Sequence, residues 1–378
     1  MKVILHLGMP KTGSTALQSS LSLNRSLLLK DGILYPELSY HPTNHNILSL
    51  LEMKDNDLPR QFISWNKIQG VDLDRVLKIS LNEIKEQVAR HSPKILIISS
   101  ENLYDAFPES SGQSLKNFFS SLGVSAEEII PVLYVRQPSK RFSSIVQQEL
   151  RASTIIPSLK MPSVVSNLRR IEKAFTKATV VTFERDTLLG NDIFIDFMQR
   201  VLLYRDIRNF KLLSASENES LSAEVISILY DYSMQCHPDF NDLFTNDRRF
   251  ILKRLPALEK KMNLYSRPVL LGEIKNAVDY ADKDLIILRN EFGVYFKEID
   301  YSRAGEIEEL PSDMNLRVDQ IFMVDHVKKS RLLMQLLNEV LEHRVRPVKY
   351  FWRLYNLPPA RYVLDNLFYF FNKLKKYF

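Results

Sequence analysis

Short apolar runs alternate with stretches of helical periodicity through the first half of the chain. Runs with strand character cover Val3–Leu7, Ile95–Ser99, Val132–Val135 and Thr179–Phe183. Apolar positions at helical spacing cover about 14–30, 72–91, 113–121, 139–152, 163–177 and 191–203. Strands that alternate with helices are typical of a mostly parallel sheet flanked by helices. The pattern therefore predicts a three-layer α/β core over about residues 1–215.

From about residue 221 the periodicity becomes mostly helical. The predicted helices cover Leu221–Met234, 247–262, 272–292 and 317–343. We expect one domain over residues 1–300, in which the α/β core is followed by a helical part at about 216–300. A helical C-terminal extension then covers residues 301–378, with a soft boundary near 300–315.

Residues 344–378 combine basic and aromatic side chains. They include eight Lys or Arg residues and a single acidic residue, Asp365. On a helix, one face would hold Val363, Leu364, Leu367, Phe371, Leu374 and Phe378. A basic amphipathic helix is typical of peripheral contact with an anionic membrane surface. The alternative is a C-terminal helix that docks on the body of the protein.

The composition limits which classes of molecule we expect this chain to bind. The chain of 378 residues has a formal net charge of +6, which suits a nucleotide, an acidic glycan or a membrane surface. Nucleic acid is not expected, because the sequence has no zinc-finger spacing, RNP-type motif or long basic arm. The single cysteine, Cys236, excludes an internal disulfide framework and a cysteine-rich metal site. With no secretory signal and no apolar run long enough to span a membrane, we expect a cytoplasmic protein.

The first apolar run leads directly into a candidate anion site. After Leu7 comes a short loop with Lys11 and Gly13, and then a helical pattern that begins with Leu17 and Leu21. In such a loop the backbone N–H groups, the helix dipole and the lysine charge all favour an anion. The Walker A order requires a lysine after the second glycine, and here Lys11 precedes Gly13. The alternative is an ordinary βα turn with one exposed lysine.

The loop resembles the 5′-phosphosulfate loop of sulfotransferases, the enzymes that use 3′-phosphoadenosine 5′-phosphosulfate (PAPS). That family loop reads close to Pro-Lys-Thr/Ser-Gly-Ser/Thr-Thr and precedes a helix with leucines. It is matched at every position by Pro10, Lys11, Thr12, Gly13, Ser14 and Thr15. The resemblance implies a P-loop-like core, PAPS as the cofactor and adenosine 3′,5′-bisphosphate (PAP) as the product. It also implies that these six residues bind the 5′-phosphosulfate.

A second motif agrees with the first. The apolar run Ile129–Val135 ends in Arg136, and Ser144 follows eight residues later on a predicted helix. In sulfotransferases an arginine and a serine at this spacing bind the 3′-phosphate of the cofactor, so the resemblance gives Arg136 and Ser144 that role. A guanidinium fork binds phosphate through two hydrogen bonds, and a hydroxyl adds a neutral donor. Taken singly, each residue has a plainer interpretation as a surface side chain.

The resemblance also implies the chemistry. An acceptor hydroxyl attacks sulfur in line with the departing phosphate, and no metal is required. Lys11 is the candidate to stabilise the charge that develops on the leaving phosphate. A general base, which is His or Glu in this family, takes the proton of the acceptor.

Three residues are candidates for that base. His45 follows a Tyr-Pro pair in a segment that resembles bacterial sulfotransferases, and Glu101 follows the predicted strand Ile95–Ile98. Glu37 lies 26 residues after Lys11, where several glycan and tyrosyl sulfotransferases have a catalytic Glu. We rank them in that order. His45 is alternatively a helix cap, Glu101 an anchor for a loop or an arginine, and Glu37 a solvated residue of a turn.

The resemblance covers about residues 1–200 and implies a bacterial, carbohydrate-type sulfotransferase. The expected acceptor is a hydroxyl on a polysaccharide or glycolipid, and the expected location is the cytoplasm, at the inner face of the membrane if the tail binds lipid. One alternative is a kinase-like transferase with a divergent phosphate loop. Another is a non-catalytic, membrane-associated scaffold with a sulfotransferase fold. The missing Walker lysine disfavours the first, and the intact Lys11 and Arg136 disfavour the second.

Overall fold

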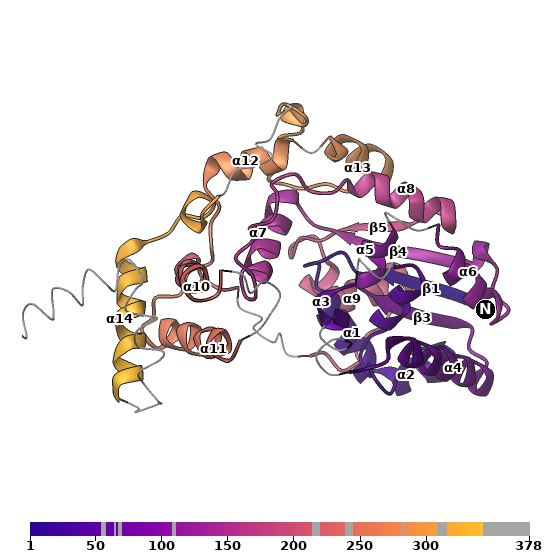
Figure 1. The fold of residues 1–378 in the computed structure, drawn as a ribbon. Coiled ribbons are helices and arrows are strands. Elements are labelled where there is room, and N and C mark those ends of the chain that lie inside the picture. Colours follow the sequence, from indigo (N-terminus) through magenta and orange to yellow (C-terminus); the bar gives the residue numbers. More distant parts are fainter. Residues whose placement is uncertain are drawn as a thin grey trace, which may run out of the picture. The chain divides into compact units, whose positions relative to one another are not determined.

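The computed structural model describes residues 1–53, 58–63, 66, 70–107, 111–213, 220–238, 245–281, 283–307 and 316–342 (Figure 1). The chain divides into two compact units, each of which is built from three separate stretches of sequence. The sheet unit comprises Met1–Arg141, Pro162–Glu217 and Asp282–Glu306. The helical unit comprises Phe142–Met161, Asn218–Ala281 and Ile307–Phe378.

The sheet has five strands, all parallel, in the order β2-β3-β1-β4-β5. Their bounds are β1 Lys2–Leu7, β2 Ile33–Leu34, β3 Ile95–Ser100, β4 Ile129–Val135 and β5 Thr179–Thr182. The predicted α/β class and the four predicted strands are therefore confirmed. The two-residue strand β2 was not predicted, because it is too short to show a pattern of its own.

Helices flank this sheet within the sheet unit. They are α1 Ser14–Leu23, α2 Arg25–Lys30, η1 Asn46–Leu51, α3 Arg60–Ile63, α4 Leu73–His91, α5 Asn102–Ala106, α6 Gln113–Ser120, η5 Ala126–Glu128, α8 Val164–Ala174, η6 Leu189–Asn191, α9 Ile193–Asp196, η7 Phe197–Val201, α13 Asp284–Phe292 and η8 Tyr301–Arg303. Helix α7, Pro138–Glu149, begins in the sheet unit and continues in the helical unit. The elements η1, α3, α5, η5 and η8 were not predicted.

The predicted helix over 14–30 is divided into α1 and α2 at Asn24. The side-chain amide of Asn24 donates to the carbonyl of Ser20 at 2.9 Å and to that of Lys211 at 2.9 Å. Its side-chain oxygen accepts from the Lys211 N–H at 2.8 Å. Asparagine side chains that bond to the backbone in this way compete with regular helix formation.

Strand β1 is buried on both faces. Ile4 packs in a cluster with Leu17 and Leu21 of α1 and with Phe194 of α9. The alternate residues Val3, Leu5 and Leu7, which point to the other face, are fully buried as well. A strand covered on both sides reads as a continuous apolar run. This explains why the central strands were readily recognised in the sequence.

The helical unit is built from α10 Ala223–Cys236, α11 Asn246–Lys261, α12 Gly272–Tyr280, η9 Val318–Gln320 and α14 His326–Glu342. Besides its apolar core, this unit has a buried lysine on α14, Lys328, which lies close to two carboxylates. The ammonium of Lys328 lies 3.1 Å from a carboxylate oxygen of Glu224 and 3.4 Å from one of Glu259. The predicted helix over 272–292 is divided, since α12 ends at Tyr280 and α13 begins at Asp284.

The predicted domain boundary near 300–315 remains a prediction, because residues 308–315 lie outside the described residues. The same holds for the basic aromatic segment 344–378 and its proposed membrane contact. Among the helices that the structure does describe, none has the length and apolar character needed to cross a bilayer.

Candidate functional site

The loop after β1 has an unusual backbone conformation. Lys11 and Gly13 both have positive φ, 69° and 78° respectively. Between them, the hydroxyl of Thr12 donates to the Met9 carbonyl at 2.7 Å, and the Thr12 N–H donates to the same oxygen at 3.3 Å. A left-handed conformation at a non-glycine residue costs about 1–2 kcal/mol, and such residues cluster at active sites and ligand-binding loops. Thr12 thus braces the turn between the two left-handed residues through its two bonds to Met9.

The first turn of α1 offers donors that the described residues do not use. Gly13 occupies the N-cap position without a side-chain cap, and no acidic residue lies in the first turn. The hydroxyl of Ser14 is buried and has no hydrogen-bond partner among the described residues. Pro10 is half-buried and Thr15 is exposed. An uncapped helix start with a buried, unsatisfied hydroxyl is suited to an anion.

Glycines at two positions allow neighbouring elements to approach the loop closely. A Cβ at Gly8 would lie 2.4 Å from the Ser14 hydroxyl and 3.2 Å from Cα of Glu101. A Cβ at Gly13 would lie 3.1 Å from the ring of Phe183. Glu101 follows β3 and Phe183 follows β5, which lie on opposite sides of β1 in the sheet order. Glu101 therefore lies on one side of the loop and Phe183 on the other.

Arg136 is brought to the loop by the pairing of β4 with β1. Its guanidinium donates to the Lys11 carbonyl at 3.0 Å, and its side chain is half-buried. The two predicted motifs therefore meet at the carboxyl edge of the sheet, although 125 residues separate them. Ser144 is half-buried on α7 but belongs to the helical unit, so its pairing with Arg136 remains a prediction.

Glu101 lies beside the loop in a partly buried position. Its backbone N–H donates to the side-chain oxygen of Asn46 at 2.9 Å, which fixes the junction between β3 and α5. Burial raises the pKa of the Glu101 carboxyl to about 7, and the charge of Lys11 opposes this shift. A carboxyl that titrates near neutral pH next to a lysine is suited to proton transfer.

His45 is fully buried, and both of its ring nitrogens are engaged. Nδ1 accepts from the Ser99 N–H at 3.0 Å, and Nε2 lies 3.1 Å from the Pro36 carbonyl. The acceptor role of Nδ1 puts the proton on Nε2, which then donates to Pro36. Burial lowers the pKa of His45 to about 4. This geometry argues against our first-ranked base, because no ring lone pair remains for a substrate proton.

We expect His45→Leu to destabilise the protein by about 2–3 kcal/mol, because the buried Ser99 N–H loses its acceptor. His45→Asn retains an acceptor near the position of Nδ1 and is expected to cost less. Urea unfolding of the three proteins measures the difference. If His45→Leu proved as stable as the wild type, the structural role of this histidine would be refuted.

The side chain and the backbone of Glu37 contact residues outside the Lys11 loop. Its carboxylate is 65% exposed and lies 3.8 Å from the guanidinium of Arg25. Its backbone pairs with the side chain of Gln87 on α4, with the N–H donating at 3.0 Å and the carbonyl accepting at 2.8 Å. These contacts fit the interpretation of Glu37 as a solvated residue of a turn and do not involve the loop.

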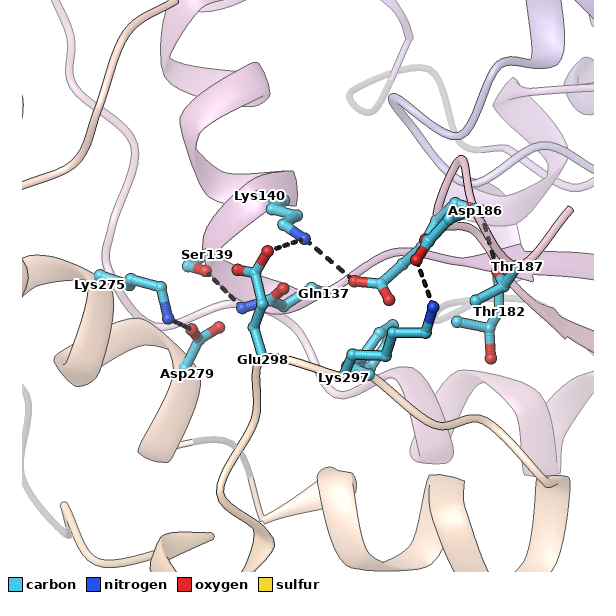
Figure 2. A network of polar contacts seen from close by, with 12 residues as sticks. Gln137, Ser139, Lys140, Thr182, Asp186, Thr187, Lys275, Asp279, Lys297 and Glu298 are labelled. Atoms are coloured by element: carbon cyan, nitrogen blue, oxygen red, sulfur yellow. Dashed lines mark hydrogen bonds and ion pairs between the residues drawn. The ribbon is translucent and has the colours of Figure 1, made fainter. Parts of the chain in front are cut away.

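A polar network beside Arg136 was missed in the sequence. Lys140, in the first turn of α7, lies 3.1 Å from Glu184 and 2.9 Å from Glu298 (Figure 2). Lys297 forms an ion pair with Asp186 (Figure 2). The partners of Lys140 are 44 and 158 residues away, so no local pattern reveals them. Across the described residues, no group of three or more His, Cys, Asp or Glu is arranged to hold a metal ion.

No family model, curated protein or solved structure matches this chain. Function is therefore inferred from the residues and their arrangement.

Proposed function

We propose that this protein is a PAPS-dependent sulfotransferase that transfers a sulfuryl group to an acceptor hydroxyl. The observation that supports this most directly is the contact between Arg136 and the loop of Lys11. It joins the two segments that resemble the 5′-phosphosulfate and 3′-phosphate sites of that family. The left-handed loop, the uncapped α1 and the unsatisfied Ser14 hydroxyl support binding of an anion at the P-loop-like site.

The two segments follow neighbouring strands, which suits a nucleotide that has phosphates on both its 5′ and 3′ oxygens. Strands β1 and β4 are neighbours, and neighbouring strands lie about 4.8 Å apart. The N–H groups of the loop and α1 would hold the 5′-phosphosulfate. Arg136 would bind the 3′-phosphate through charge-assisted hydrogen bonds. Ser144 is the proposed second ligand of that phosphate.

We propose a role for each side chain in this reaction. PAPS supplies an activated sulfuryl group, which leaves its phosphate oxygen as the acceptor oxygen bonds to sulfur. Glu101 takes the proton of the acceptor hydroxyl, since its carboxyl is partly buried beside the loop. Lys11 balances the negative charge left on the 5′-phosphate oxygen. The product nucleotide is PAP.

The acceptor class rests on the resemblance alone. We propose a carbohydrate hydroxyl, on a polysaccharide or a glycolipid, and a cytoplasmic location. The net charge of +6 is compatible with an acidic glycan or with anionic lipid.

Titration calorimetry with PAP and with ADP, which lacks the 3′-phosphate, tests this proposal. We expect the wild type to bind PAP tightly and ADP weakly. Arg136→Ala should weaken PAP binding by about 10- to 100-fold, because charge-assisted hydrogen bonds contribute about 1.5–3 kcal/mol. Binding of ADP should not change. Arg208→Ala, which removes a largely exposed arginine paired with Asp206, is the matched control.

Two results would contradict the proposal. Equal binding of PAP and ADP would favour a kinase-like transferase, and no binding of either would favour a non-catalytic scaffold. A loss of both nucleotides in Arg136→Ala would mean that this arginine only braces the loop through the Lys11 carbonyl.

A further inference from the structure

The stretch 203–213, which follows η7 in the sheet unit, places three leucine side chains on the surface. Leu203 is 77% exposed, Leu212 is 51% exposed and Leu213 is 41% exposed. Leu203 also has a positive φ of 58°, a conformation that is unfavourable for leucine. Apolar side chains that gather on the surface of a folded protein mark a site of contact with another protein or with a membrane.

The inner side of this stretch fixes it to the sheet unit. Tyr204, Ile207 and Phe210 pack against the apolar cluster that contains Phe194. The ring centroids of Tyr204 and Phe210 lie 5.3 Å apart, and the Tyr204 hydroxyl donates to the carboxylate of Asp31 at 2.6 Å. Because the residues at positions 204, 207 and 210 point inward, the exposed leucines lie on the outer side of the stretch.

The end of α1 extends the same surface. Asn24, which separates α1 from α2, donates to the Lys211 carbonyl at 2.9 Å and accepts from the Lys211 N–H at 2.8 Å. This contact brings Leu23, the last residue of α1, close to Leu212, and Leu23 is 42% exposed. The leucine surface, as we call it, consists of Leu23, Leu203, Leu212 and Leu213. It lies at the opposite end of α1 from the loop that precedes this helix.

Positively charged side chains are interspersed with these leucines. Three exposed basic residues form no ion pair with any residue that the structure describes: Lys30, Arg205 and Lys211. Two acidic residues lie in the same segments. Asp206 is paired with Arg208 at 2.6 Å, and Asp31 accepts the hydrogen bond from Tyr204. The leucine surface therefore has an excess of positive charge around its apolar side chains.

We infer that the leucine surface binds an anionic lipid membrane, with the leucines in the headgroup region and the basic side chains on lipid phosphates. This inference does not depend on the proposed function. Apolar side chains gain from burial at the boundary of the acyl chains, and each basic residue near anionic lipid adds attraction. A second copy of this surface is disfavoured, because a symmetric interface would bring the unpaired cations together. Nucleic acid is disfavoured, because leucine offers no π face on which a base can stack.

Sedimentation of the whole chain with lipid vesicles tests the inference. The wild type should bind vesicles of equimolar phosphatidylglycerol and phosphatidylcholine, and should bind phosphatidylcholine alone much more weakly. Leu203→Asn combined with Leu212→Ser should weaken binding by about 10- to 100-fold, because both apolar side chains are lost from the headgroup region. Asparagine tolerates the positive φ of position 203, so the fold should be retained. Met323→Ser combined with Val327→Ser, at positions 60% and 63% exposed in the helical unit, is the matched control.

A second double variant tests the charges. Arg205→Gln combined with Lys211→Gln should weaken binding to the anionic vesicles by about 10- to 30-fold, or roughly fivefold for each charge. Added salt should weaken binding of the wild type in the same way, because salt screens the attraction between exposed charges. Lys78→Gln combined with Lys85→Gln, which changes two exposed lysines of α4, is the matched control and should bind as the wild type does.

Several results would overturn the inference. One is failure of the wild type to bind either kind of vesicle. Another is unchanged binding in both double variants, because a different part of the chain, such as segment 344–378, would then make the membrane contact. A loss in only one of the two double variants would also overturn it, since the surface would then lack either lipid insertion or charge attraction. Urea unfolding checks that each variant is folded, and Leu212→Ala alone repeats the test if the leucine double variant unfolds.

Discussion

Glu101→Gln is expected to lower kcat for sulfuryl transfer by about 10²- to 10⁴-fold and to change PAP affinity by no more than about twofold. Glutamine has the size of glutamate but cannot accept the proton of the acceptor hydroxyl. Transfer of radiolabelled sulfate from PAPS to a panel of nitrophenyl glycosides measures kcat, and calorimetry measures PAP binding. Glu37→Gln is the matched control, because that carboxylate lies on the surface beside Arg25.

The pH dependence of transfer follows from the burial of Glu101. Its pKa of about 7 means that the carboxyl is largely protonated at pH 6 and largely ionised at pH 8. Below the pKa, kcat/KM should therefore fall by about tenfold per pH unit, and above it the rate should level off. The residual kcat/KM of Glu101→Gln should not show this dependence on pH. A wild-type rate that is flat between pH 5 and pH 8 would exclude Glu101 as the base.

Burial of the same carboxyl also makes stability depend on pH. Since the folded pKa is raised, the folded state binds the proton of Glu101 more tightly than the unfolded state does. The contribution of Glu101 to stability is present at low pH and is lost as the pH rises toward and through about 7. The wild type should therefore lose stability relative to Glu101→Gln between pH 5 and pH 8, as urea unfolding would measure.

Lys11→Gly is expected to lower kcat by about 10²- to 10³-fold, the effect of removing one group that stabilises transition-state charge. Glycine adopts the positive φ of this position without strain, so unfolding stability should change by no more than about 1 kcal/mol. Lys11→Arg keeps the charge and is the matched comparison. Retention of full transfer activity in Lys11→Gly, measured with the same glycosides, would show that this lysine does not act on the leaving phosphate.

Among the proposed site residues, those of the two motifs were the easiest to identify. Lys11, Gly13 and Ser14 lie close together in one strand–loop–helix segment, whose conformation depends on near neighbours in the chain. Arg136 directly follows a buried strand. Parallel strands end at one edge of a sheet, and the pairing of β1 with β4 brings the two motifs together there. The division at Asn24 was missed because its partner, Lys211, lies 187 residues away.

The ranking of the candidate general bases could not be obtained from residue type and spacing. His45 and Glu101 both precede short helices and both lie near β3. What separates them is that the Ser99 N–H occupies the lone pair of His45, whereas burial beside Lys11 sets the pKa of Glu101. Burial and hydrogen bonding between distant segments decide such roles, and a single sequence does not contain them.

The amino-acid sequence by itself determined the α/β class, the four longer strands and the strand–loop–helix segment that contains Lys11, because these depend on local periodicity and on turn residues. Only the tertiary structure decided that Arg136 contacts Lys11, that His45 is buried with both nitrogens engaged, and that the Tyr295 N–H bonds to Thr182. The physical reason is that these properties arise from contacts across long sequence separations, such as the 113 residues between Thr182 and Tyr295. Such contacts form only when the whole sheet unit assembles.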